Sequence, residues 1–273
     1  MNTLTSVDGT SIAYERSGAG PPLVLVHGTA ADHTRWEPLR PALEKRFTVY
    51  AIGRRGRGES GDATDYALSR EAEDVVTLID SIDDPVVLLG HSYGAMCSLE
   101  AALRTDSLDS LVLYEPPLPV SDRDPDSADA LDEISALIND GEREQALVHF
   151  YREIVGTPPA AIEAYRTSSD WSVRVEAAPT VVREERARKG YEFDATRVAE
   201  LRSPTLLLYG EESDPFFEDV THVLDDTLPN SQVTVLTGHG HGAINTAPEL
   251  FLEEVSAFLG ESTYWGDSDG SET

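Results

Sequence analysis

The chain has 273 residues, which is long enough for one large α/β domain that carries an insertion. Apolar residues make up 40% of it, a share typical of globular proteins, and this excludes an intrinsically disordered chain. Fifty Asp and Glu residues against 21 Lys and Arg residues leave a formal net charge of −29, so nucleic acid and anionic membrane surfaces are excluded as expected partners.

The acidity also predicts a salt requirement. Only two of the basic residues are lysines, Lys45 and Lys189. A composition low in lysine and rich in Asp and Glu is typical of halophilic proteins, which come from salt-loving organisms. We therefore expect the fold to need dissolved salt that screens its own charge repulsion.

The single cysteine, Cys97, excludes an internal disulfide and a metal cluster held by cysteines. Its position inside a predicted helix indicates a small buried core residue. Residues 1–20 are mixed and polar, unlike a signal peptide, and no run of about 18 apolar residues occurs. The sequence therefore predicts a soluble, cytoplasmic protein without a membrane partner.

Buried strands are predicted wherever a short run of Val, Leu and Ile occurs, and helical stretches separate most of them. Ser11–Arg16 is expected as an edge strand before them, closed by the Gly- and Pro-rich turn at residues 18–22. This alternation favours a mostly parallel sheet with crossover helices. The predicted strands are Leu23–Val26, Val49–Ile52, Val86–Leu89, Leu111–Leu113, Thr205–Tyr209 and Val233–Leu236, and the predicted helices among them are Trp36–Lys45, Ser69–Ile82, Gly94–Arg104, Phe217–Leu228 and Pro248–Leu259.

Between Leu118 and Leu201 no strand-like run occurs, and the pattern is helical throughout. We predict an inserted helical cap at 118–201, a core made of 1–117 and 202–260, and an acidic flexible tail at 261–273. The predicted cap helices are Ala128–Asn139, Glu142–Val155, Ala160–Ser168 and Val173–Arg186.

The stretch Gly90-His91-Ser92-Tyr93-Gly94 joins a predicted strand to a predicted helix. The chain must reverse so sharply there that the serine adopts a strained backbone, and side chains at the flanking glycines would collide with a neighbouring strand. The hydroxyl is then held at the N-terminus of a helix, whose dipole favours an oxyanion. We predict Ser92 as a nucleophile; a glycine-lined turn with an incidental serine is the alternative.

A serine hydroxyl needs a base within hydrogen-bond reach, and His241 is the best candidate among the seven histidines. It follows the last predicted strand, in the loop Gly238-His239-Gly240-His241, just before the final helix. His239 is a nearby competitor that we interpret as structural. The two histidines are also spaced as metal ligands, but no third ligand motif is visible, so no metal site is predicted.

The imidazole needs a carboxylate that fixes its tautomer and stabilises its charged form. Glu115 follows the sixth strand directly, and Asp214 follows the seventh, so both are expected at the same edge of the sheet. Either one can be the acid on this reasoning. The alternative for each is a surface carboxylate in a chain that already has fifty acidic residues.

An oxyanion formed at Ser92 needs amide donors. Tyr93 supplies one, because it follows the nucleophile. The other is expected from the loop after an early buried strand, with Thr29 or Ala30 as the donor and Gly28 allowing close approach of the backbone. Four loops that follow strands are thus predicted to converge at one edge of the sheet.

Taken together, these motifs resemble the α/β-hydrolase family, in the family's order and over nearly the whole chain. The resemblance implies the α/β-hydrolase fold: a mostly parallel eight-stranded sheet flanked by helices, with 118–201 as the inserted cap. It also implies a triad of Ser92, His241 and an acid. The matching segments are His27-Gly28, Arg54-Arg-Gly-Arg-Gly-Glu-Ser60, Gly90–Gly94 and Gly238–His241 with Pro248.

The sequence departs from the family's usual pattern at the acid. The family often places an aspartate where Ser213 stands here, and Asp214 lies one residue further on. One group of dehalogenases in the family carries a glutamate at the position of Glu115, which makes Glu115 the slightly favoured acid. The serine nucleophile argues against epoxide hydrolases and haloalkane dehalogenases, which use aspartate.

We therefore predict a serine hydrolase that acts on a small, mostly apolar acyl substrate, a carboxylic ester or lactone, without a metal or organic cofactor. A cofactor-free haloperoxidase-like activity and the hydrolysis of a carbon–carbon bond are alternatives on the same triad, and a ligand-binding receptor with little turnover is an alternative of another class. The oligomeric state is left open. The predicted substrate pocket comprises His27, His91, Tyr151 and Trp171.

Overall fold

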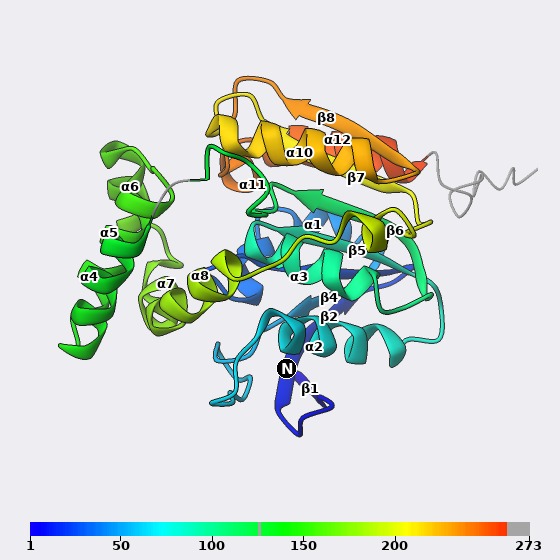
Figure 1. Ribbon diagram of the computed structural model, residues 1–273. Coiled ribbons are helices and arrows are strands. Elements are labelled where there is room, and N and C mark those ends of the chain that lie inside the picture. The colour runs from blue at the N-terminus through cyan, green and yellow to red at the C-terminus, as the bar shows by residue number, and fades with distance from the viewer. Residues whose placement is uncertain (125–126, 261–273) are drawn as a thin grey trace, which may run out of the picture.

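The computed structural model describes residues 1–124 and 127–260, and its sheet has eight strands in the order β1-β2-β4-β3-β5-β6-β7-β8. The pairings β1–β2 and β2–β4 are antiparallel, and all the others are parallel. Figure 1 shows the sheet with helices on both of its faces. The strands are β1 (Asn2–Thr5), β2 (Ser11–Gly18), β3 (Pro22–Val26), β4 (Thr48–Ile52), β5 (Val86–His91), β6 (Leu108–Tyr114), β7 (Thr205–Gly210) and β8 (Ser231–Leu236).

The central strands are buried on both faces, which explains their continuous runs of Val and Leu. Every residue of β3 and of β5 is buried. One hydrophobic cluster packs α2 (Leu68–Asp80), α3 (Tyr93–Ala102) and α10 (Pro215–Thr227) on one face of the sheet. A second cluster packs the other face against a short 3₁₀ helix η1 (His33–Trp36), α1 (Arg40–Leu43), α11 (Ala243–Thr246) and α12 (Pro248–Gly260).

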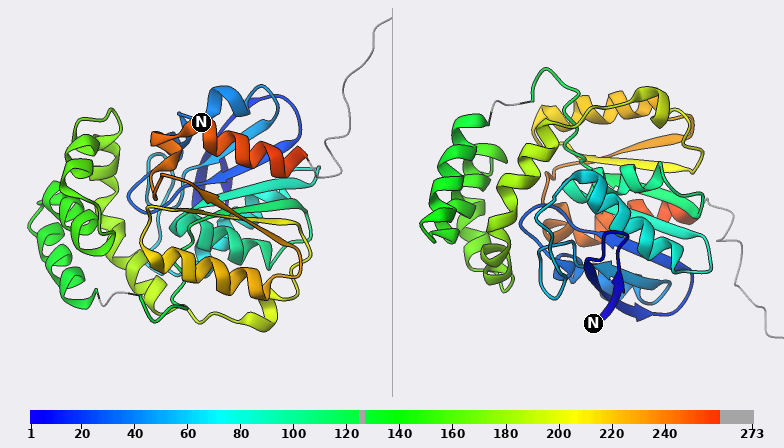
Figure 2. Two further views of the ribbon diagram at one scale, coloured as in Figure 1. Left: turned by 90° about the horizontal axis from the view of Figure 1, so that it is seen from above. Right: turned by 60° about the horizontal axis from the view of Figure 1, so that its bottom comes forward.

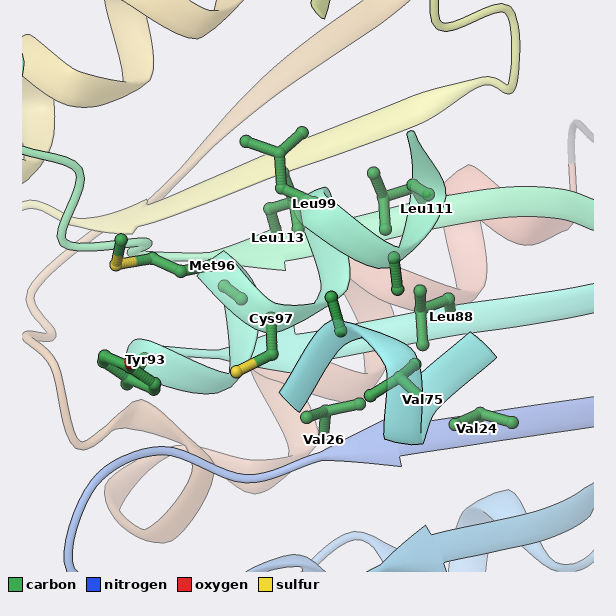
Figure 3. Close-up of a cluster of buried hydrophobic side chains, with 14 of the residues drawn as sticks. Val24, Val26, Val75, Leu88, Tyr93, Met96, Cys97, Leu99, Leu111 and Leu113 are labelled. Atoms are coloured by element: carbon green, nitrogen blue, oxygen red, sulfur yellow. The ribbon is translucent and has the colours of Figure 1, made fainter. Parts of the chain in front are cut away.

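Cys97 belongs to the first of these clusters and is fully buried, as the sequence predicts. Figure 3 shows it on α3, among Met96 and Leu99 of the same helix and the valines of β3. Burial raises the pKa of its thiol to about 12, so the thiolate form is scarce near neutral pH. The side chain therefore acts as a small apolar group in the core.

The described residues between β6 and β7 form helices and no strand. Figures 1 and 2 show α4 to α7 gathered at one end of the molecule, beside the sheet rather than over either of its faces. They have a hydrophobic cluster of their own, which includes Ile134, Leu147 and Phe150. The elements are α4 (Ala128–Asn139), α5 (Arg143–His149), a π-helical turn η2 (Phe150–Ile154), α6 (Pro159–Arg166), α7 (Trp171–Ala177), a 3₁₀ turn η3 (Ala178–Thr180), α8 (Val181–Lys189) and α9 (Ala195–Val198).

The predicted sheet is confirmed, and the differences from the sequence prediction have local causes. The helix expected at Trp36–Lys45 is two short pieces, because Pro38 and Pro41 interrupt it. The helix expected at Val173–Arg186 is broken at η3, which contains Pro179. The strand β1 was not predicted, since it is short and mostly polar. The predicted tail lies outside the described residues.

The parallel strands direct one set of loops to one edge of the sheet. The carboxyl ends of β3, β5, β6, β7 and β8 meet there, which is where sites form in sheets of this kind. None of the described helices combines the length and the apolar character that crossing a membrane requires.

Candidate active site

Ser92 lies in the turn between β5 and α3, with a φ of 57° and a ψ of −128°. The flanking glycines are needed for this turn. A Cβ at Gly94 would lie 2.3 Å from the carbonyl oxygen of His27, and a Cβ at Gly90 would lie 2.5 Å from the hydroxyl of Ser98. The turn therefore holds Ser92 at the N-terminus of α3, as the motif predicts.

Positive φ angles mark this edge of the sheet. Among the described residues other than glycine they occur at Ala30 (51°), Ser92 (57°) and Glu115 (49°). These residues follow β3, β5 and β6, whose carboxyl ends lie side by side. Such conformations cost energy and persist where the surrounding structure imposes them, which is common at functional sites.

The structure brings Glu115 into contact with His241. Glu115 is fully buried, and its Oε2 lies within hydrogen-bond reach of Nδ1 of His241. Its other carboxylate oxygen accepts a hydrogen bond from the amide of Gly210 at 2.7 Å. Each carboxylate oxygen therefore has a hydrogen-bond partner, and together the two contacts orient the carboxylate toward the imidazole.

Neighbouring side chains fix the loop that carries His241. The hydroxyl of Tyr114 donates a hydrogen bond to the carbonyl oxygen of Gly240 at 2.6 Å. A Cβ at Gly210 would lie 2.4 Å from the carbonyl oxygen of His239, so only glycine lets the loop approach β7 this closely. The ring of Phe217 stacks on the His241 imidazole, with 5.0 Å between centroids and an interplanar angle of 18°.

Asp214, the other candidate acid, has a different role in the structure. It is exposed, and its Oδ1 accepts a hydrogen bond from the amide of Phe216 at 2.9 Å. It is therefore the N-cap of α10, a position that favours aspartate. No hydrogen bond or ion pair joins it to His241 in the described part of the chain.

The predicted oxyanion residues lie on two sides of Ser92. Tyr93 is the first residue of α3, so its amide has no acceptor within the helix. On the other side, a Cβ at Gly28 would lie 2.9 Å from the Cβ of Ser92, which shows how closely this loop approaches the serine. Thr29 follows, and its hydroxyl donates a hydrogen bond to Glu184 at 2.8 Å. Ala30 has the positive φ already noted.

His27 does not belong to the substrate pocket, which corrects the sequence prediction. It is fully buried, and both ring nitrogens have backbone partners. Nδ1 donates to the carbonyl oxygen of Gly28 at 2.9 Å, and Nε2 accepts from the amide of Arg54 at 3.2 Å. Burial, aided by the charges of Arg54 and Arg57, holds its pKa well below the ordinary value, so it is neutral and supports the loop before Thr29.

His91 is close to the predicted base. Its Nε2 donates to the carbonyl oxygen of His241 at 3.1 Å, and its ring lies 4.6 Å from the His241 ring, measured between centroids. Burial and the neighbouring charges of His241 and Arg35 lower its pKa well below the ordinary value. It is therefore a neutral donor that helps to position the His241 loop.

Two cavities meet at Ser92 and His241. We call the first the arginine cavity; it encloses about 590 Å³, including its open part, and its walls carry Arg35, Tyr151, Tyr165, Arg174 and Asn245. We call the second the phenylalanine cavity; it measures about 870 Å³, including its open part, and its walls carry Phe150, Ile154, Phe216 and Phe217 besides several charged side chains. Ser92, His241 and Thr29 line both.

Tyr151 lines the arginine cavity, whereas Trp171 lines neither of the two cavities. The Trp171 ring stacks with that of Tyr151 at a centroid distance of 6.4 Å and packs in the cluster of the inserted helices. Its indole N–H donates to Glu144 at 3.3 Å. Trp171 therefore packs against Tyr151 without lining the cavity itself.

The sequence analysis missed Arg35 and Arg174. Arg35 lies on η1 and Arg174 on α7, and each is at most 8% exposed. Burial and the charge of Arg174 lower the pKa of Arg35 to about 10, which leaves it charged at neutral pH. No motif or spacing singles out these two residues, since they come close only where η1 and α7 line the same cavity.

The described residues contain no group of three His, Cys, Asp or Glu side chains arranged to hold a metal ion.

A family model described as the alpha/beta hydrolase family matches residues 23–254. The chain belongs to the alpha/beta hydrolase family. Among solved structures, this alpha/beta hydrolase is similar to an alpha/beta hydrolase from Sphaerobacter thermophilus, with 34% identity, a TM-score of 0.84, and coverage of 94% of this chain and 100% of that one.

Two curated relatives are similar over nearly their whole length. The pimeloyl-[acyl-carrier protein] methyl ester esterase of Aeromonas hydrophila is 27% identical, with 92% of this chain and 100% of that protein covered. The 2-(acetamidomethylene)succinate hydrolase of Mesorhizobium japonicum is 26% identical, with 91% of each chain covered. These comparisons support a hydrolase, as the sequence analysis predicts.

Proposed function

We propose that this alpha/beta hydrolase cleaves a carboxylic ester or lactone through an acyl-enzyme on Ser92. The observation that carries the proposal is the contact between the buried Glu115 carboxylate and Nδ1 of His241, beside a cavity that His241 shares with Ser92. A carboxylate at Nδ1 leaves Nε2 free to accept a proton, which is the arrangement that a serine nucleophile needs.

In the proposed first step, His241 takes the proton of the Ser92 hydroxyl while the serine oxygen attacks the ester carbonyl. The amide of Tyr93 and an amide of the Thr29–Ala30 segment stabilise the oxyanion, each contributing about 2.7–4 kcal/mol to the transition state. The intermediate collapses, the C–O bond to the alcohol breaks, and His241 returns the proton to the leaving alcohol.

In the second step, His241 removes a proton from water, and the resulting hydroxide attacks the acyl-enzyme. The bond between the acyl carbon and Ser92 breaks, and the acid product leaves. Glu115 keeps its charge throughout and holds the imidazole in the Nδ1–H tautomer. None of these steps requires a metal or an organic cofactor.

The second cavity supports an apolar part in the substrate. Phe150, Phe216 and Phe217 line it, so an acyl or alcohol chain placed there would contact aromatic rings. Phe150 belongs to the inserted helices and Phe216 to α10, so we propose that these helices act as a cap that selects small acyl compounds. The esterase named among the relatives favours the ester over the other bond classes.

The test is sustained release of a chromophore from a p-nitrophenyl ester, measured at high salt. Ser92→Ala should abolish turnover, and mass spectrometry of the wild type after rapid quenching should show the acyl group on the peptide that contains Ser92. Binding with at most one slow burst would instead indicate a receptor. Sustained turnover by Ser92→Ala would overturn the proposal.

A further inference from the structure

Six arginine side chains are buried in the described part of the chain, and Arg35 differs from the other five. Each of the five lies within ion-pair distance of a carboxylate, whereas no carboxylate of the described residues lies within 4.0 Å of the Arg35 guanidinium. The five pairs are Arg54 with Glu71, Arg55 with Asp74, Arg57 with Glu184, Arg174 with Asp170 and Arg188 with Asp124.

The one side-chain partner of Arg35 among the described residues is neutral. Its Nη1 donates to the amide oxygen of Asn245 on α11. Arg35 as a residue is 7% exposed, and it lies in the wall of the arginine cavity, together with Ser92 and His241. A buried cation without a counter-charge is unfavourable, so the fold keeps Arg35 at a cost that an anion in the cavity would offset.

The neighbouring charges define what kind of anion fits. Arg174 is also in the wall, but Asp170 balances its charge through an ion pair of 2.7 Å. One positive charge therefore remains without a partner, which suits a monoanion. A guanidinium presents a planar fork of donors that matches a carboxylate in size and geometry.

We propose that Arg35 binds a free carboxylate of the substrate, so that this enzyme acts on esters that carry one carboxylate besides the bond to be cleaved. The proposal rests on the proposed function, and it narrows the substrate class from acyl compounds in general to half-esters and similar monoanions. The carboxylate lies in the arginine cavity, the ester carbonyl lies at Ser92, and the apolar remainder extends into the phenylalanine cavity.

The test compares matched ester pairs that differ only in charge. The first series compares the p-nitrophenyl half-esters of succinate, glutarate and adipate with their neutral methyl esters. In this series the carboxylate is on the acyl side. The second series compares 4-acyloxybenzoates with their methyl esters. In this series the carboxylate is on the leaving group. Each pair is assayed at one salt concentration with the wild type, Arg35→Gln and Arg35→Lys.

The control is Arg166→Gln, which makes the same change in net charge at an exposed arginine of α6. We expect the wild type and the control to prefer the carboxylate member of at least one series by roughly ten- to a hundredfold in kcat/KM. In Arg35→Gln the ratio of kcat/KM between the two members of each pair should fall to about one, and Arg35→Lys should keep part of the preference. No preference in the wild type, or a preference that survives in Arg35→Gln, would overturn the proposal.

Two further measurements distinguish a loss of carboxylate binding from a loss of folding, and they test the carboxylate site independently of the proposed ester hydrolysis. Because Arg35 has no ion pair to lose, Arg35→Gln should unfold at the same temperature as the wild type or a higher one. In calorimetry, Ser92→Ala should bind monomethyl glutarate more tightly than dimethyl glutarate, and adding Arg35→Gln should remove the difference. This binding result does not depend on whether any ester is hydrolysed. If Ser92→Ala with and without Arg35→Gln bound monomethyl glutarate equally well, the carboxylate site would be contradicted.

Discussion

Glu115 and Asp214 show how two carboxylates at one sheet edge acquire different roles. Glu115 is fully buried, has a positive φ and uses both carboxylate oxygens, one toward Gly210 and one toward His241. Asp214 is exposed and caps a helix. Only the first arrangement lets a carboxylate control the tautomer of an imidazole.

We therefore expect Glu115→Gln to lower kcat on an activated ester by roughly four orders of magnitude, the loss known for the corresponding change in serine proteases. A glutamine can turn its amide donor toward Nδ1, which stabilises the wrong tautomer. Asp214→Asn should leave kcat nearly unchanged, because asparagine is also a good N-cap. The reverse ranking in steady-state kinetics would reject Glu115 as the acid.

Of the individual residues of the site, the sequence predicts some and not others. Ser92 and His241 stand in motifs whose geometry follows from local turns, and both residues line the two cavities. The choice between Glu115 and Asp214 could not be made from spacing, since both follow neighbouring strands. Arg35 could not be found at all, because an arginine without a counter-charge is recognised only when its surroundings are known.

Among the elements, α8 connects the inserted helices to the sheet. It carries Glu184, which is fully buried and forms ion pairs with Arg54 and Arg57 of the loop after β4. The same carboxylate accepts a hydrogen bond from Thr29 in the predicted oxyanion loop. The position of α8 is therefore linked directly to the loop beside Ser92.

Removing this carboxylate should be costly. We expect Glu184→Ala to lower the free energy of unfolding by about 3–5 kcal/mol, because it leaves buried positive charge without its partner. The matched change Glu163→Ala, in an exposed pair with Arg166, should cost about 0–1 kcal/mol. Urea unfolding of both variants at high salt checks this, and similar losses for the two would show that the buried pairs do not stabilise the fold.

The elements themselves were largely predictable. Strands buried on both faces have continuous apolar runs, so β3, β5 and β7 were found with errors of one or two residues at their ends. Prolines account for the breaks in the helices expected at Trp36–Lys45 and Val173–Arg186. The positions of α7 and α8 were not predictable, since that of α8 depends on long-range ion pairs with the loop after β4 and that of α7 on contacts within the inserted helices.

For the molecule as a whole, the charge of −29 is the dominant electrostatic feature. Like charges spread over one surface repel one another, and dissolved ions shorten the range of this repulsion from about 10 Å at 0.1 M to about 3 Å at 1 M. The predicted salt requirement follows from this argument.

We expect the melting temperature to rise when KCl is raised from about 0.1 M to about 2 M, most steeply below about 1 M, where the screening length changes most. Differential scanning calorimetry measures this. Sucrose at the same osmolality is the control, because it favours compact states without screening charge. If sucrose gives as large a rise as KCl, repulsion between the acidic residues is not what limits stability.

The burial of Cys97 has a practical consequence for studying this molecule. Its thiol is the only one in the chain, lies within the core and rarely ionises, so maleimides and similar reagents should leave the native protein untouched. A cysteine introduced at an exposed site on α6, such as Glu163→Cys, would then take up a single fluorescent dye. Such a dye would report whether the helices at the end of the sheet move when a ligand arrives.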